Sequence, residues 1–123
     1  MLVGVCRIAL RLPGIASLKE KRSVVRSVLE RARARHPVSA AEVAEQDSHD
    51  RAILGFVIAS NDEAHATSVL QAVVREVEAS GLAPIERVRM QVLHAGAFDR
   101  GADDVRAPTR SWADFESDDE EEG

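Results

Sequence analysis

The chain of 123 residues contains one cysteine and no tyrosine, and aromatic residues make up only 3% of it. A single cysteine excludes an internal disulfide framework, and a chain of this length can bury a core without disulfides or a structural metal. No run of about 18 apolar residues is present, and the alternating pattern after Met1 is unlike a signal peptide. We therefore expect a cytoplasmic protein with no membrane partner.

Charge is divided unevenly along the chain. Residues 1–95 carry 13 Lys and Arg against 11 Asp and Glu, a net charge of +2, whereas residues 96–123 carry 3 against 10, a net charge of −7. Beyond residue 95 the apolar periodicity is lost, and residues 118–122 are all acidic. Such a segment buries too little apolar surface to offset its ordering entropy. We predict one domain over residues 1–95 and a disordered acidic tail over residues 96–123.

Apolar periodicity predicts six elements in the order βαββαβ. The expected strands cover residues 2–12, 38–45, 52–59 and 85–93, and the expected helices cover residues 18–35 and 62–80. A capping box formed by Ser17 and Glu20 precedes the first helix, and Asn61 is expected to cap the second. Residues 52–59 are apolar on both alternating faces, so this strand should be covered on both sides.

The order of these elements predicts a ferredoxin-like α+β sandwich. Its four-stranded sheet should have the order 4-1-3-2, with both helices on one face. The other face would remain open. The side chains expected there are Val3, Val5, Arg7 and Arg11 from the first strand, and Arg87 and Arg89 from the fourth.

The first predicted helix is strongly basic, with seven basic and two acidic residues between positions 19 and 35. At 100° per residue, four cations fall within an arc of about 60° beside the apolar stripe. These are Lys19, Arg22, Arg26 and Arg33. Arginine grips phosphate oxygens with two parallel hydrogen bonds, and each neutralised phosphate releases counterions. The stripe is therefore a candidate phosphate-binding surface, and an ordinary solvated helix face is the alternative.

The open face of the sheet has two interpretations. Arg7 and Arg11 could contact RNA there, but the two strands that carry the basic residues contain no aromatic side chain on which bases could stack. Any RNA recognition on this face should therefore depend on the RNA backbone and on the shape of the RNA, not on its bases. Val3 and Val5 share this face, so burial against a second copy to form a homodimer is the alternative.

No catalytic site, metal site or cofactor is expected. The four histidines lie in separate predicted elements, with no nucleophile and carboxylate at a useful spacing. Cys6 lies on the inward face of its strand and should be a small core residue. Glu45, Asp47, His49 and Asp50 could offer oxygen and nitrogen ligands, but a polar hairpin loop explains them. We therefore expect a protein that is not an enzyme.

Two aromatic residues, Trp112 and Phe115, stand in the acidic tail. They could form a short docking motif that folds on a partner, or they could belong to a plain solvated segment. The tail carboxylates could also compete with nucleic acid for the basic helix, as a tethered mimic.

Several short motifs resemble one known family. They are Ser-Leu-Lys-Glu-Lys-Arg at residues 17–22, Glu-Val at residues 42–43 and Gln-Asp at residues 46–47 followed by Arg51. Over residues 1–94 they are similar to the bacterial YlxP-like family of unknown function, DUF503. His49 stands where members often carry tryptophan, and the acidic tail lies outside the family pattern.

This resemblance implies a ferredoxin-like fold. The family's genomic setting, among translation-initiation and ribosome-maturation genes, implies a structured RNA or a ribosomal subunit as the partner. The leading hypothesis is therefore a non-enzymatic RNA- or ribosome-associated module that binds the phosphate backbone through its basic helix. A homo-oligomeric regulatory protein assembled through the open sheet is the alternative.

Overall fold

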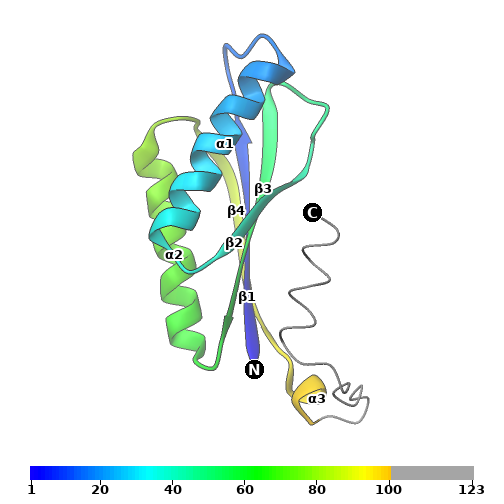
Figure 1. Ribbon diagram of the computed structural model, residues 1–123, viewed down its shortest axis with the longest axis vertical. Coiled ribbons are helices and arrows are strands. Elements are labelled where there is room, and N and C mark those ends of the chain that lie inside the picture. Colours follow the sequence, from blue (N-terminus) through cyan, green and yellow to red (C-terminus); the bar gives the residue numbers. More distant parts are fainter. Residues whose placement is uncertain (101–123) are drawn as a thin grey trace, which may run out of the picture.

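The computed structural model describes residues 1–100. The elements are β1 (Leu2–Arg11), α1 (Leu18–Arg35), β2 (Ser39–Ala44), β3 (Arg51–Ser60), α2 (Glu63–Ser80), β4 (Ile85–His94) and α3 (Gly96–Asp99). The predicted order βαββαβ is confirmed, and the short α3 follows it. Figure 1 shows α1 and α2 on one side of the sheet, and the short α3 beyond the end of β4.

The four strands form one antiparallel sheet in the order β2-β3-β1-β4. This is the predicted order 4-1-3-2 read from the opposite edge, so the ferredoxin-like sandwich is confirmed. β1 pairs with β3 along its whole length, from Leu2 opposite Ser60 to Arg11 opposite Arg51. It pairs with β4 on its other side, where Leu2 lies opposite His94. Because β1 lies between two strands, its side chains occupy the centre of both sheet faces.

The core lies between the sheet and the two long helices. Alternate residues of β1 point into it, and the helices contribute the stripes that their apolar spacing predicts. The buried helix residues are Val25, Val28, Leu29 and Ala32 of α1, and Ala66, Leu70, Val73 and Val77 of α2. At Gly4, an added Cβ would lie 3.0 Å from the Leu70 side chain. This glycine therefore lets α2 approach the sheet closely.

Side chains cap both long helices. The Glu20 N–H donates to the Ser17 hydroxyl (3.2 Å), as predicted, and the Glu20 carboxylate reaches back to accept from the N–H of Ala16 (3.1 Å), one residue before the cap. The prediction of Asn61 as the cap of α2 is wrong by one residue. Asp62 is the cap, and its carboxylate accepts from the N–H groups of Ala64 and His65, at 2.9 and 3.3 Å. The negative charge of the Asp62 carboxylate also interacts favourably with the positive end of the helix dipole, whereas the neutral amide of Asn61 has no such charge.

The predicted coverage of β3 on both sides is also wrong. Val57 points to the open face and is 42% exposed, because both long helices pack on the other side of the sheet. After β4, the Ala95 N–H donates to the Met1 carbonyl (2.9 Å), and Asp99 of α3 pairs with the N-terminal ammonium. The rest of the predicted tail, residues 101–123, lies outside the described residues. Among the helices of residues 1–100, none has the length and hydropathy needed to cross a bilayer.

Candidate nucleic-acid interface

The four predicted cations of α1 are all exposed on the outer surface of the helix. Lys19, Arg22, Arg26 and Arg33 recur at intervals of one or two helical turns over about 21 Å of helix length. None of the ion pairs formed within residues 1–100 involves any of them. By contrast, Arg35 at the end of α1 lies 2.9 Å from the carboxylate of Glu76 on α2. The four side chains thus form a charged stripe, which we call the α1 stripe.

Lys21 has a different role from its basic neighbours. Its side chain is almost completely buried, with 1% exposure, and its Nζ donates to the carbonyl oxygens of Glu45 and Ser48. The same Nζ lies 2.9 Å from Glu42 Oε2, in an ion pair between α1 and β2. The sequence contains a signal for this burial, because at 100° per residue Lys21 falls on the apolar side of the helix, between Val28 and Ala32.

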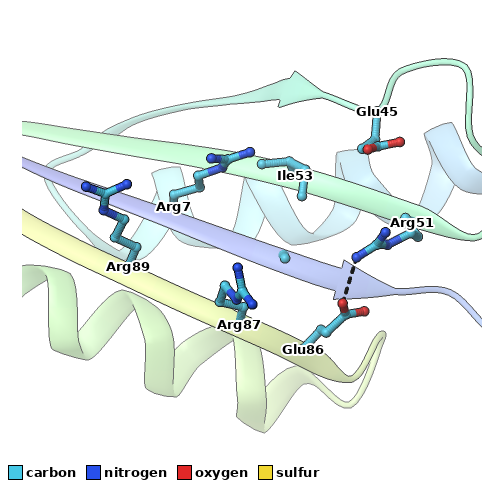
Figure 2. A pocket seen from close by; sticks show the side chains of 8 residues that line it. Arg7, Glu45, Arg51, Ile53, Glu86, Arg87 and Arg89 are labelled. Carbon is cyan, nitrogen blue, oxygen red and sulfur yellow. Dashed lines mark hydrogen bonds and ion pairs between the residues drawn. The ribbon is translucent and has the colours of Figure 1, made fainter.

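The second predicted basic surface lies on the open face of the sheet. Arg7 of β1 and Arg89 of β4 are cross-strand partners, and Arg87 is on the same face. These three arginines and Arg51 line a hollow of about 280 Å³, together with the carboxylates of Glu45 and Glu86. Figure 2 shows the side chains that line it. Within residues 1–100 no carboxylate forms an ion pair with any of the three. Like charges directly opposite one another destabilise a sheet, so this arrangement favours a bound anion.

Arg11 was predicted to belong to the same surface, but it has a counter-ion. Its Nε lies 3.6 Å from one oxygen of Glu86, while Nη2 of Arg51 lies 2.7 Å from the other oxygen (Figure 2). Sequence reasoning missed Glu86 because the β1–β4 register shifts between Ala9 and Leu10. The unpaired part of the surface therefore consists of Arg7, Arg87 and Arg89.

The open face also carries exposed apolar side chains. Val57 of β3, Leu93 of β4 and Val43 of β2 are 42%, 45% and 52% exposed. Val43 lies over Gly55, where an added Cβ would be 2.9 Å from a Val43 methyl carbon. A second hollow of about 370 Å³ includes Val5 and Val57 in its lining, and it shares Arg7 and Arg89 with the basic hollow. Along β1 and β4 the face thus has an apolar half, with Val3, Val5 and Leu93, and a cationic half, with Arg7, Arg87 and Arg89.

The described residues present few groups suited to catalysis. Cys6 lies in the core as predicted, with 3% exposure, and burial raises the pKa of its thiol to about 11. In the β2–β3 loop, the Ser48 hydroxyl donates to Asp50 at 2.7 Å and lowers the pKa of that carboxyl. No group of three potential metal-ligating side chains comes together within residues 1–100. Exposed guanidinium groups such as those on these two surfaces bind anions by charge-assisted hydrogen bonds.

The fold and these surfaces define a small ferredoxin-like α+β protein with an exposed basic helix and an open sheet face. Residues 3–90 match the family described as protein of unknown function, DUF503, and the chain belongs to this family. No curated protein matches the sequence.

Several solved structures resemble the fold. A candidate antibiotic biosynthesis monooxygenase from Chloroflexus aurantiacus is 19% identical, with a TM-score of 0.47 over 78% of this chain and 96% of its own. The cofactor-independent oxygenase SnoaB from Streptomyces nogalater is 16% identical, with a TM-score of 0.40 over 89% and 97%. A REP-associated tyrosine transposase bound to a REP hairpin is 14% identical, with a TM-score of 0.42 over 80% and 59%. At these identities the likeness concerns the fold alone.

The motifs that carry the family resemblance meet in space around Lys21. This residue belongs to the run at residues 17–22, and it pairs with Glu42 of the Glu-Val motif. The Gln46 amide of the Gln-Asp motif donates to the Glu42 carbonyl at 3.5 Å. These motif residues therefore hold α1, β2 and the β2–β3 loop together, which is a structural role. The α1 stripe extends beyond the motif, since Arg26 and Arg33 lie outside it.

Proposed function

We propose that this protein is a non-enzymatic module that binds the phosphate backbone of structured RNA, in the setting of the ribosome, through the α1 stripe. The observation that supports the proposal is that Lys19, Arg22, Arg26 and Arg33 are exposed on one side of one helix. Within residues 1–100 they have no carboxylate partner. Two other cations of the helix, Lys21 and Arg35, do have carboxylate partners, whereas Arg31, on the opposite side of the helix, forms no ion pair within residues 1–100.

Physical chemistry favours a polyanion as the ligand of such a stripe. Four rigidly spaced cations gain little from separate small ions, whereas a phosphate backbone neutralises all of them and releases its condensed counterions. RNA duplexes are recognised mostly through phosphate, 2′-hydroxyl and shape contacts. The open sheet face offers no stacking platform, because Phe56, the only aromatic residue in the described sheet, is completely buried under the helices. The exposed side chains therefore suit binding to the phosphate backbone of RNA and not stacking on its bases.

The two basic surfaces do not form a single interface. α1 lies on one side of the sheet, and Arg7 and Arg89 project from the other (Figures 1 and 2). One rigid RNA helix would contact one surface at a time. We assign the phosphate backbone to the α1 stripe because its charges follow one straight element, whereas the sheet arginines share their face with apolar side chains.

A pair of charge reversals on the stripe tests the proposal. Arg22→Glu with Arg26→Glu should abolish most binding to structured RNA and co-sedimentation with ribosomal subunits. The matched control is Arg31→Glu with Arg75→Glu, which changes the net charge equally but alters exposed residues away from the stripe. Loss of binding in the control as well would assign the effect to net charge. Unchanged binding in the stripe variant would remove the stripe as the site.

A homo-oligomeric regulatory protein is the second candidate function. It is favoured by the exposure of Val57 and Leu93 on the open face. If this face joins two copies, light scattering at tens of micromolar protein should show a dimer, and Val5→Glu should return it to a monomer. A strict monomer at that concentration would count against this assembly.

A further inference from the structure

The two halves of the open sheet face follow one another along the strands. Near the start of β1 the face carries Val3 and Val5, beside Leu93 of β4. Two residues further along β1, Arg7 lies opposite Arg89, and Arg87 follows. The apolar hollow and the cationic hollow meet at Arg7 and Arg89, which line both. A ligand that covers both hollows must therefore carry an apolar part and an acidic part, in that order.

One segment of the same chain has this composition in this order. Residues 111–122 contain Trp112 and Phe115, followed by five consecutive acidic residues at positions 118–122. This segment lies outside the described residues, so the argument rests on its sequence and on the surface that would receive it. The chain leaves the sheet at His94, which pairs with Leu2 at the apolar end of the face. The chain therefore leaves the sheet beside the apolar half of the face, and the aromatic residues precede the acidic run in the sequence. The two parts of the segment thus have the same order as the two halves of the face.

We propose that the open sheet face is the docking site of the chain's own segment at residues 111–122. Trp112 and Phe115 cover the apolar half, and the acidic run neutralises the cationic half. The free energy comes from burying aromatic surface against valine and leucine side chains and from relieving the repulsion between Arg7 and Arg89. The proposal does not depend on RNA binding by the α1 stripe.

The lengths are compatible with this placement. The 12 residue steps from Arg100 to Trp112 can reach up to about 40 Å, whereas a ten-residue strand such as β1 spans about 33 Å. The acidic run begins three and ends seven residues after Phe115, a separation of roughly 10 to 24 Å in an extended chain. Along β4, Leu93 and Arg87 are six residues apart, which corresponds to about 20 Å.

A second copy of the protein fits this face less well than the tethered segment. In a face-to-face dimer, both copies would bring Arg7, Arg87 and Arg89 to the interface, and these cations would oppose each other or cover apolar side chains. Residues 101–123 carry nine acidic and two basic residues, so they supply the opposite charge. The covalent link also gives the segment a high effective concentration at the face.

The sequence provides a direct optical test. Trp112 is the only tryptophan and the chain has no tyrosine, so intrinsic fluorescence reports on this segment alone. In the full-length protein at low salt, the proposal predicts emission at shorter wavelength than in the guanidinium-unfolded chain. It also predicts severalfold weaker quenching of Trp112 by acrylamide. Emission and quenching equal to those of the unfolded chain would overturn the proposal.

Two variants and one control locate the docking site. Arg7→Glu with Arg89→Glu replaces a pair of opposed cations by a pair of opposed carboxylates. The repulsion between the two side chains stays similar, but the charge of the face is reversed. This double variant should expose Trp112. Replacing the Asp and Glu residues at 118–122 by Asn and Gln should also expose it, and that change leaves the described residues unaltered. Arg22→Glu with Arg26→Glu, on the opposite side of the molecule, should leave Trp112 protected. Circular dichroism checks that each variant is folded.

Other occupants would give different results. Exposure of Trp112 by the α1 variant, with no effect of the sheet variant, would place the acidic segment on the helix and overturn the proposal. Protection that increases with protein concentration, together with a dimer in sedimentation, would show docking onto a second copy and would also overturn it. Protection that is independent of concentration and lost in the sheet variant supports the intramolecular contact.

Discussion

The Nζ of Lys21 and Oε2 of Glu42 lie 2.9 Å apart, in an ion pair that joins α1 to β2 under the loop between β2 and β3. The same Nζ donates to two loop carbonyls, those of Glu45 and Ser48. Glu45 holds a left-handed backbone conformation with φ of 62°, which is uncommon for a residue other than glycine. The lysine thus satisfies loop carbonyls and holds an otherwise unfavourable turn in place.

Replacing Lys21 by methionine should therefore destabilise the protein. Lys21→Met keeps the aliphatic packing but leaves the Glu42 carboxylate without its cation and removes a donor from two loop carbonyls, of which only that of Glu45 keeps another donor, the Ser48 N–H. We expect a loss of about 2–4 kcal/mol in the free energy of unfolding. Urea titration followed by circular dichroism measures it. The control is Lys19→Met, an exposed lysine on the same helix, which should change stability by less than about 0.5 kcal/mol. Equal effects at both positions would contradict the structural role of Lys21.

Gly4 should tolerate no large side chain. A Cβ there would lie 3.0 Å from both the Ile58 and the Leu70 side chains, in the layer between the sheet and α2. We expect Gly4→Val to lower the free energy of unfolding by about 1–3 kcal/mol through overpacking, and Gly4→Ala to cost less. Thermal unfolding of the two variants checks the order. A valine variant as stable as the parent protein would show that the layer has room to spare.

Cys6 should be an unreactive thiol. Burial raises its pKa from 9.0 to about 11, so at pH 8 only ~0.1% of it is thiolate. We expect slow reaction with a disulfide reagent in the native protein and fast reaction after unfolding. Fast reaction of the native protein would contradict the burial of this side chain.

The same shift makes stability depend on pH in one direction. The folded-state pKa lies above the unfolded value, so the contribution of Cys6 is fully present below pH 9 and is lost as the pH rises towards 11. The expected loss at pH 11 is roughly 2 kcal/mol. Urea titrations across this range measure it, and Cys6→Ala should remove this part of the decline.

The fold could be predicted because each element has a local signal. Alternating apolar residues define the strands, the capping box begins α1, and Gly81 ends α2 with its φ of 66°. The local signals were ambiguous at the cap of α2, since Asn61 and Asp62 are adjacent residues that both favour this position. They failed for β3, since an apolar run cannot show that Val57 faces an uncovered side of the sheet.

Among the surface residues, the positions on one helix could be predicted from the sequence, but the ion pairs between distant segments could not. Helix geometry alone places the α1 stripe on one side, and the structure shows those side chains exposed. The pairing of Arg11 with Glu86 depends on the register of two strands far apart in the sequence, and a β-bulge alters that register. The pairing of Lys21 with Glu42 depends on packing between α1 and β2. Ion pairs between distant segments were therefore the part that the sequence could not provide.

The salt dependence of RNA binding tests the central claim most directly. The logarithm of the association constant for a structured RNA should fall linearly with the logarithm of the salt concentration. In Arg22→Gln with Arg26→Gln the slope should become shallower by roughly 2, because two phosphate contacts are lost, while Arg31→Gln with Arg75→Gln should keep the parent slope. An unchanged slope in the stripe variant, or equal changes in both pairs, would contradict phosphate binding by the α1 stripe.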